Sequence, residues 1–303
     1  MYEQAVAIVQ PTDEELAWLF ADTYETTPVA QGFGVFKASE LNEIGIQTSR
    51  ALAKAINNGR LRKIAYGIYA CRSANQQVVH AISLGGRISC LSACKLYGLW
   101  VPDCSKFHIL ARRGEVKAKA NILVHSQRNR PSLLVPSPLE AVKQVLRFHD
   151  AETGLIVLDS ALNKGFLSNE EVPALIRGLP ERKQKVLSRA TGLAQSGLET
   201  RVRNFLISER VSVRPQVEIP TVGRVDMVAG ESLIVECNGD AFHSSKEQRN
   251  RDYLRIQRAR LLGYETVSLS YEQIFHRWEE TKAYLRALIR QRKHLKKPIP
   301  LTK

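Results

Sequence analysis

The sequence has no apolar run that approaches the roughly 20 residues needed to cross a bilayer, and its first residues lack the positive charge that opens a signal peptide. Cysteine is also scarce. Five cysteines in 303 residues, an odd number, do not describe a disulfide framework. These absences predict a cytoplasmic protein without a membrane segment, folded in a reducing compartment.

Basic residues are missing from the first 36 positions. Residues 12–20 read as a short helix with Thr12 as N-cap and an acidic first turn, inside an acidic arm that we place at residues 1–28. We expect an ordinary solvated helix; a second interpretation, in which the arm folds over a basic groove and competes with nucleic acid, stays open. The acidic residues of this opening segment are Glu3, Asp13, Glu14, Glu15, Asp22 and Glu25.

The rest of the chain is strongly basic. It holds all 44 Lys and Arg but only 24 of the 30 Asp and Glu, which gives a formal net charge of +20. Such an excess is typical of a protein that binds a polyanion, and double-stranded DNA is the partner we expect. An acidic membrane surface is the competing explanation, but no strongly amphipathic basic helix supports it.

Residues 35–59 have the layout of two helices around a tight turn at Gly45. Residues 60–69 follow as a hairpin-like run in which basic and apolar side chains alternate. Together they predict a winged helix-turn-helix whose second helix enters the major groove, although a helix-turn-helix that serves protein contacts only is an alternative. The expected base readers are Gln47, Thr48, Ser49 and Arg50, and the expected phosphate contacts from the wing are Arg60, Arg62 and Lys63.

This segment resembles the N-terminal domain of the abortive-infection type IV antitoxins. The likeness rests on the pattern Gly-x-Leu-x-x-Ile-x-x-Gly-x-Tyr at residues 59–69. It extends into the middle of the chain at residues 89–99 and at a helix start near Pro138. The resemblance implies a DNA-binding protein of antitoxin type, and it leaves a cognate toxin or a second copy of the chain open as a partner.

The middle region, residues 73–190, is mixed in character. Its pattern predicts strands at residues 106–111 and 121–125 and helices at residues 138–148 and 153–163. A basic, helix-like linker follows at residues 180–193. This region offers little chemistry beyond its cysteines and histidines.

Four residues of the middle region have spacings close to those of structural zinc sites. Cys90 and Cys94, however, fall four apart on a helix with small apolar residues, where a free cysteine behaves as a small hydrophobe. We therefore expect packing rather than zinc binding. His125 and His149 have no carboxylate partner at motif spacing, so we expect no site role for them. The four candidates are Cys90, Cys94, Cys104 and His108.

Two short apolar runs near the C-terminus, residues 222–228 and 233–237, are separated by a turn that contains Gly230 and predict a hairpin. Asp226 sits inside the first run and Glu236 near the end of the second. An ionised carboxylate among Val, Met, Leu and Ile is costly unless it is paired or bound to a metal. Because the two positions offer only oxygen ligands, they suit Mg²⁺ or Mn²⁺ and suit Zn²⁺ poorly.

The same stretch resembles the endonuclease domains related to very-short-patch-repair enzymes, in the restriction-endonuclease-like PD-(D/E)xK superfamily. The likeness rests on Asp226, on Glu-x-Asn-Gly at residues 236–239, on His243, on Arg-Asp-x-x-Arg at residues 251–255 and on Leu-Gly-Tyr at residues 262–264. It also covers residues 196–203.

This resemblance implies that Glu199 lies beside the metal and that Asp226 and Glu236 hold it. The chain departs from the superfamily at Asn238, where a lysine normally orients the attacking water. His243 is the expected replacement. From the residues alone, Glu199 has a second interpretation as the partner of Arg203 in an i, i+4 ion pair.

The segment after His243 predicts a helix rich in arginine, on which Arg251 and Arg255 are expected to clamp phosphate. Residues 286–303 are predicted to be a frayed basic tail that adds affinity for phosphate.

We therefore expect an α/β (α+β) protein that acts as a DNA endonuclease dependent on Mg²⁺ or Mn²⁺. The rival is an antitoxin-like transcriptional regulator whose nuclease fold is inactive and only binds DNA. The expected division is an acidic arm at 1–28, a winged helix-turn-helix at 29–72, a middle antitoxin-like domain at 73–190, a restriction-endonuclease-like domain at 191–295 and a basic tail at 296–303.

Overall fold

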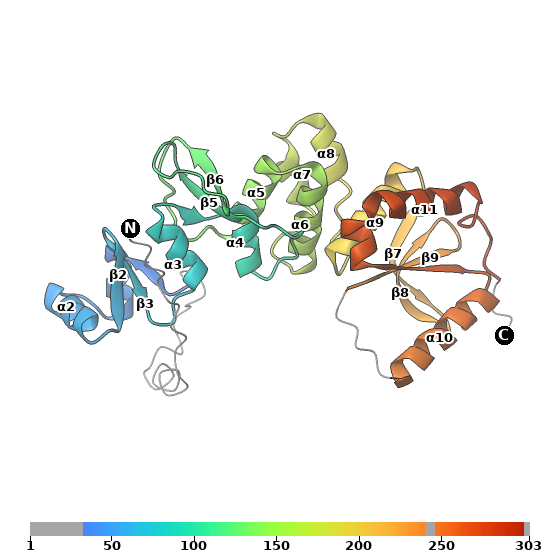
Figure 1. Cartoon of the computed structure of the whole chain (residues 1–303), viewed down its shortest axis with the longest axis horizontal. Coiled ribbons are helices and arrows are strands. Elements are labelled where there is room, and N and C mark those ends of the chain that lie inside the picture. The colour runs from blue at the N-terminus through green and yellow to red at the C-terminus, as the bar shows by residue number, and fades with distance from the viewer. Residues whose placement is uncertain (1–32, 240–245, 300–303) are drawn as a thin grey trace. The chain divides into compact units, whose positions relative to one another are not determined.

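The computed structural model describes residues 33–239 and 246–299, so the acidic arm, its expected helix and His243 lie outside the described residues. The described part is a mixed α/β protein with three small sheets (Figure 1). The chain divides into two compact units. The first comprises Met1–Ile88 and Ile109–Ser137, and the second Ser89–His108 and Pro138–Lys303.

The first unit opens with a three-stranded antiparallel sheet in the order β1-β3-β2. The elements are β1 (Val35–Lys37), the 3₁₀ helix η1 (Ala38–Ile44), α2 (Ser49–Asn57), β2 (Leu61–Ala65) and β3 (Ile68–Cys71). Their common core contains Leu41, Ala55, Leu61 and Tyr69, supplied by η1, α2 and the two hairpin strands. The hairpin predicted at residues 60–69 and the second of the two predicted helices are both present.

The first of those helices is only partly correct. Residues 35–37 form β1 because they pair with β3, in the register Val35↔Ala70 to Lys37↔Ile68. Residues 38–44 form the 3₁₀ helix, and Gly45 ends it at a φ of +78°, a left-handed conformation that glycine adopts without strain. The tight turn at Gly45 is therefore confirmed.

The rest of the first unit contains α3 (Gln76–Ser83) and a second sheet in the order β4-β5-β6. The strands are β4 (Arg87–Ile88), β5 (Phe107–Arg112) and β6 (Ile122–Gln127). The two longer strands match the strands predicted at residues 106–111 and 121–125. Asn75 caps α3, since its side-chain oxygen accepts from the backbone N–H groups of Gln77 and Val78.

The second unit begins with a group of helices around α6. They are α4 (Cys90–Leu96), α5 (Pro138–Phe148), α6 (Ala151–Asn163), α7 (Val172–Ile176) and α8 (Glu181–Leu187). Helix α6 is buried continuously from Gly154 to Ala161. A side chain at Gly154 would come within 3.1 Å of Leu187 on α8 and 3.2 Å of Leu146 on α5, so glycine lets the three helices approach closely. The two helices predicted for this stretch are confirmed.

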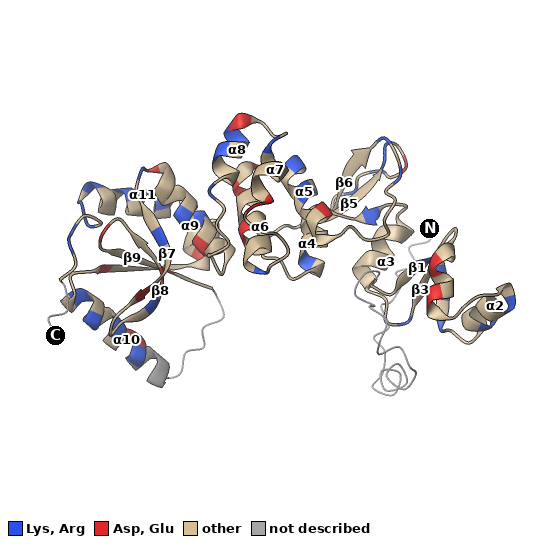
Figure 2. Cartoon of the chain, turned by 180° about the vertical axis from the view of Figure 1, so that it is seen from behind, with Lys and Arg blue, Asp and Glu red and all other residues tan. Residues whose placement is uncertain are grey.

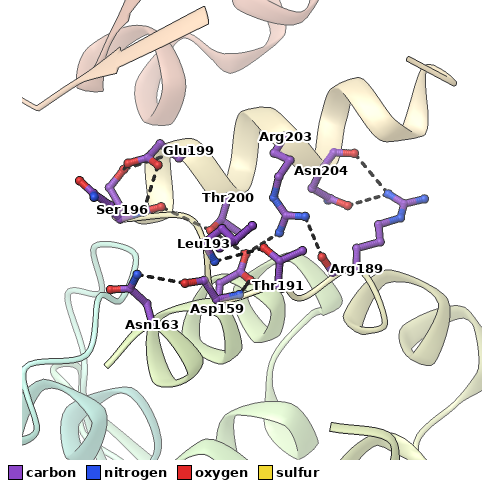
Figure 3. Close-up of polar contacts among 12 residues, drawn as sticks. Asp159, Asn163, Arg189, Thr191, Leu193, Ser196, Glu199, Thr200, Arg203 and Asn204 are labelled. Carbon is purple, nitrogen blue, oxygen red and sulfur yellow. Dashed lines mark hydrogen bonds and ion pairs between the residues drawn. The ribbon is translucent and has the colours of Figure 1, made fainter. Parts of the chain in front are cut away.

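Asp159, near the end of α6, joins this helical group to α9 (Gly197–Ser208) through a buried ion pair. Its carboxylate accepts a hydrogen bond from Arg203 Nη2 at 2.5 Å and from Thr200 Oγ1 at 2.9 Å (Figure 3). It also accepts the backbone N–H groups of Thr191 and Gly192 at 2.8 Å and 3.0 Å. The side chains of Arg203 and Asp159 are 3% and 1% exposed, which makes this pair one of buried charges.

The C-terminal part of the second unit is a four-stranded sheet in the order β10-β9-β8-β7. The first three strands in sequence, β7 (Val213–Ile219), β8 (Gly223–Ala229) and β9 (Leu233–Asn238), are antiparallel, and β10 (Glu265–Ser270) runs parallel to β9. The connection from β9 to β10 contains α10 (Lys246–Leu261). The hairpin and the strand at residues 266–269 were predicted, whereas β7 was not.

Each face of this sheet is covered by helices (Figure 1). One face packs Met227, Val235 and Leu269 against α9 and α11 (Trp278–Arg290). The other packs Val228 and Ile234 against Ala259 and Leu262 at the end of α10. Between β10 and α11, residues Glu272–His276 form a turn of π-helix, η2. The sheet is therefore the middle layer of three.

The prediction of a frayed tail from Arg286 onward is wrong for the described residues. Arg286 to Arg290 belong to α11. Beyond the helix, His294 O accepts the backbone N–H of Glu231 at 2.7 Å, and Ile299 N donates to Leu262 O at 2.9 Å. The prediction relied on the basic composition of this segment. Composition alone cannot indicate that its backbone forms hydrogen bonds with the sheet and with α10.

The buried ion pair gives a test of what holds α9 in place. Asp159→Ala should lower the free energy of unfolding by about 3–5 kcal/mol, because Arg203 would remain buried without a counter-charge. Chemical denaturation followed by circular dichroism measures the change. Glu280→Ala on α11, which removes the exposed partner of Arg277, is the control and should leave stability nearly unchanged. Equal effects of the two substitutions would show that the ion pair does not anchor α9.

Candidate active site in the C-terminal sheet

Asp226 and Glu236 lie side by side where β8 and β9 part. The ladder between the strands ends at Met227↔Val235. Beyond it, side chains replace backbone pairing: Asp226 N donates to Glu236 Oε2 at 3.1 Å, and Cys237 N donates to Asp226 Oδ2 at 2.7 Å. The two carboxylates predicted to share a cation are therefore neighbours, and each accepts a backbone N–H from the opposite strand.

Both carboxyl groups are half-buried, and this determines their protonation. Burial raises the pKa of Asp226, opposed by the hydrogen bond from Cys237 and by the positive charges of Arg255 and Arg224. Burial and the adjacent Asp226 charge raise the pKa of Glu236. Two ionised carboxylates in one half-buried place repel each other, so this site favours either a proton or a cation.

Glu199 enters from α9. It lies in the first turn of the helix, where Ser196 caps the helix by accepting Glu199 N at 3.2 Å and donates its hydroxyl to Glu199 Oε1 at 2.9 Å. Gln195 N and Gln216 Nε2 donate to Glu199 Oε2 at 3.0 Å and 2.8 Å. Burial, together with the charge of Asp226, raises the pKa of Glu199. Glu199 is 5% exposed, and the field of Asp226 reaches it.

The alternative role for Glu199, an ion pair with Arg203, is not what the structure contains. The guanidinium of Arg203 points to Asp159 instead (Figure 3). On α9, residues 199 and 203 therefore serve different groups: Glu199 belongs to the carboxylate site, and Arg203 to the buried pair that fixes the helix.

Gln216 is a site residue that the sequence did not reveal. The register of β7 and β8 passes from Pro215↔Met227 to Val217↔Val225, which leaves Gln216 opposite Asp226 and outside the ladder. Its φ is +51°, an uncommon value for a residue other than glycine, and its side chain donates to Glu199. A glutamine in a strand of mixed composition carries no sequence signal of this unusual backbone conformation.

A cavity of about 330 Å³ opens beside the carboxylate pair, between α10 and the sheet. Glu236, Asn238, Thr266 and Ser268 line it from β9 and β10, while Asp252 and Arg255 line it from α10. Asp226 and Glu199 lie outside its wall. Of Asp226, Glu236 and Glu199, only Glu236 lines the cavity. Asn238 lies at the rim of the cavity and is exposed at the end of β9.

Arg255 is not a free phosphate clamp in this structure. Its guanidinium donates to the carbonyl oxygens of Val222 at 3.0 Å and Arg224 at 2.8 Å, and to Glu236 Oε1 at 3.3 Å. It therefore ties α10 to the start of β8 and partly neutralises Glu236. Arg251, one turn earlier, is exposed. Lys and Arg recur along the described part of α10 and along α11 (Figure 2).

The residues predicted to contact DNA from the first unit are mostly exposed. Gln47, Thr48, Ser49 and Arg50 lie at the start of α2, where Thr48 also caps the helix by accepting Ala51 N at 3.1 Å. On the wing, Arg62 Nη2 donates to Gln76 Oε1 at 3.2 Å, and Lys63 lies over the ring of Tyr66 at 5.7 Å. Arg60, which precedes the wing, is half-buried.

A second group of side chains could hold a metal ion. In the second unit, one ligand atom each from Cys90, His108 and His149 lie within 4.8 Å of one another. His149, for which no site role was predicted, belongs to the group, whereas Cys94, for which packing was expected, does not.

Comparison with known proteins adds no assignment: no family model matches this chain, and no curated protein matches it either. None of the described helices is long and apolar enough to span a membrane.

The raised pKa values make a stability prediction. A carboxyl group whose pKa is raised by folding costs no stability below the ordinary carboxyl pKa of about 4, and its cost grows as rising pH ionises it. Asp226→Asn keeps an acceptor for Cys237 N but removes one charge. It should be more stable than the wild type at pH 7 without divalent cations, by about 1 kcal/mol for each unit of pKa relieved.

Thermal unfolding from pH 4 to pH 8 measures this difference, which should shrink toward zero at pH 4. Glu218→Gln, a charge removal at an exposed position of β7, is the control and should show little difference at any pH. An Asp226→Asn protein no more stable than the wild type at pH 7 would refute charge repulsion at the site.

Proposed function

We propose that the protein is a metal-dependent endodeoxyribonuclease, with its active site at Asp226, Glu236 and Glu199. The observation that carries the proposal is the placement of Asp226 and Glu236 where β8 and β9 part. Carboxylates buried together at the end of a strand pair cost stability, and a divalent cation would offset that cost. The order β10-β9-β8-β7, with the carboxylates on the two inner strands, supports a domain of restriction-endonuclease type.

The residues present fit Mg²⁺ or Mn²⁺, since Asp226, Glu236 and Glu199 offer only carboxylate oxygens as ligands. Asp226 and Glu236, with Glu199 behind them, would hold the ion, and when bound it would polarise the phosphoryl group and lower the pKa of a water. Gln216 and Ser196 hold the carboxylate of Glu199 in place through hydrogen bonds. Arg255 would leave Glu236 for the phosphate.

The mechanism also needs a group that accepts a proton from the attacking water. Asn238 occupies the position of the expected lysine and cannot accept a proton, although it lines the cavity beside Glu236. We assign the role to His243, because an imidazole with an ordinary pKa near 6.5 can accept a proton from water at neutral pH. His243 follows β9 by a few residues and lies in the segment outside the described residues.

Targeting to DNA is assigned to the first unit, as a winged helix-turn-helix of antitoxin type. The exposed start of α2 would supply base contacts, and the hairpin of β2 and β3 would lie against phosphates. The positive charge along α10 and α11 would add affinity that does not depend on sequence.

A specific observation supports the rival function, an antitoxin-like regulator without nuclease activity. Arg255 already supplies a positive charge to Glu236, since its Nη2 lies 3.3 Å from Glu236 Oε1. If that ion pair persists in the presence of divalent cations, the C-terminal domain binds DNA without cleaving it.

Cleavage of supercoiled plasmid tests the proposal. The full chain should nick or linearise the plasmid with Mg²⁺ or Mn²⁺, and not with EDTA. Asp226→Asn and Glu236→Gln should each abolish cleavage while DNA binding is kept or becomes tighter, because a charge that repels phosphate is removed. His243→Ala should lower the rate by roughly 10² to 10⁴.

Glu218→Gln is the matched control, since it removes a carboxylate from the same sheet at an exposed position and should leave the rate unchanged. If wild type and Asp226→Asn cleave equally in matched preparations, the activity is a contaminant and the regulator is the better assignment.

DNA binding by the first unit has its own test. Arg50→Ala should weaken binding to a selected site several-fold more than binding to random duplex, because Arg50 lies at the leading end of α2. Fluorescence anisotropy at several salt concentrations measures both affinities, and the log–log slope should be steep, at roughly 0.9 per neutralised phosphate. Lys143→Ala, on α5 and paired with Glu140, is the control. Equal loss on both duplexes would show that Arg50 does not read bases.

A further inference from the structure

The Cys/His cluster of the second unit, defined as Cys90, His108 and His149, comes from three separate segments. Cys90 begins α4, His108 lies at the start of β5, and His149 follows α5. Cys90 and His108 are 0% and 1% exposed, so the ligand atoms are shielded from water. The rings of His108 and His149 stack with centroids 5.1 Å apart and an angle of 18° between their planes.

The backbone around the cluster is held in an unusual shape. Cys90 has a φ of +53°, in the left-handed region that side chains rarely adopt. Its N–H donates to Gln144 Oε1 on α5 at 2.8 Å. His108 N donates to Ser92 Oγ at 2.9 Å, and Ser89 N donates to His108 O at 3.0 Å. Strained backbone of this kind persists where several contacts fix it and is common at functional sites.

The donor set is one thiol and two imidazoles. Zn²⁺ takes such mixed ligands in closed, tetrahedral sites, whereas Mg²⁺ and Ca²⁺ prefer oxygen. Burial raises the pKa of Cys90 to about 12, so without a metal the group is a thiol, and a bound cation would displace its proton to solvent. The positive charge of Lys183, whose ammonium donates to His149 O, disfavours a cation beside His149. The negative charge of Asp150 favours a cation there.

We propose that Cys90, His108 and His149 bind Zn²⁺ as a structural site that fastens the start of α4 and the start of β5 to the end of α5. A structural zinc site takes four ligands. Two further residues are candidates for the fourth: Cys104, whose Sγ lies 2.9 Å from His108 Nε2, and His125, which is also buried. The site is separate from the carboxylates, so the proposal does not depend on nuclease activity.

Metal analysis of the full chain tests this directly. The protein is purified under reducing conditions without added metal or chelator, and zinc is measured per chain. About one Zn²⁺ per chain is expected. After chelation, Co²⁺ should bind in its place and give the visible and near-ultraviolet absorption of a tetrahedral site with a thiolate ligand. Wild-type protein that is folded and reduced but takes up neither Zn²⁺ nor Co²⁺ would overturn the proposal.

Matched variants identify the ligands. Cys90→Ala and Cys94→Ala make the same change four residues apart on α4, at two fully buried positions. Cys90→Ala and His149→Ala should lose zinc at least tenfold and lose the cobalt absorption, whereas Cys94→Ala should keep both. Cys104→Ala and His125→Ala then show the fourth ligand as the one whose loss lowers zinc content more. Equal zinc in Cys90→Ala and wild type would refute the site even if the variant is less stable.

Asp226→Asn separates this proposal from the nuclease. It should keep its zinc while losing cleavage. If zinc is lost in Asp226→Asn but kept in Cys90→Ala, the ion is bound by the carboxylates. That result would contradict both the assignment of Zn²⁺ to the Cys/His cluster and the assignment of Mg²⁺ or Mn²⁺ to the carboxylates.

Discussion

The C-terminal domain depends on how two carboxylates are accommodated between β8 and β9. Backbone pairing stops where Asp226 and Glu236 meet, and the side chains accept the backbone N–H groups that the ladder leaves over. A similar break occurs on the other side of β8, where Gln216, opposite Asp226, is left out of the pairing between β7 and β8. Backbone pairing is therefore interrupted around Asp226, and negative charge is concentrated at that interruption.

The surroundings of that place follow from the need to compensate charge. Arg255 reaches from α10 to Glu236, and Glu199 is held from α9 by Ser196, Gln195 and Gln216. Helix α9 is itself fixed by the buried pair of Arg203 and Asp159, so the position of Glu199 depends on α6 as well (Figure 3). Arg255 forms an ion pair with Glu236 but not with Asp226, so negative charge remains at the site for a divalent cation to neutralise.

The sequence predicted these features to different degrees, and the reasons are physical. Apolar periodicity predicted β8, β9, β10 and the helices α5 and α6, because their burial is one-sided or continuous. It could not predict Gln216, whose role depends on an unusual backbone conformation within β7, or the pair of Asp159 and Arg203, which are 44 residues apart in sequence. Spacing also grouped Cys90 with Cys94 along one helix, whereas folding brings Cys90 to histidines from β5 and from the end of α5.

The account is tested most directly by locating a bound ion. Crystals of the full chain grown with Mn²⁺ would show the ion by its anomalous scattering. We expect a peak bound by Asp226 and Glu236, with the guanidinium of Arg255 moved away from Glu236. An absence of manganese there, with Arg255 still paired to Glu236, would contradict a metal-dependent nuclease.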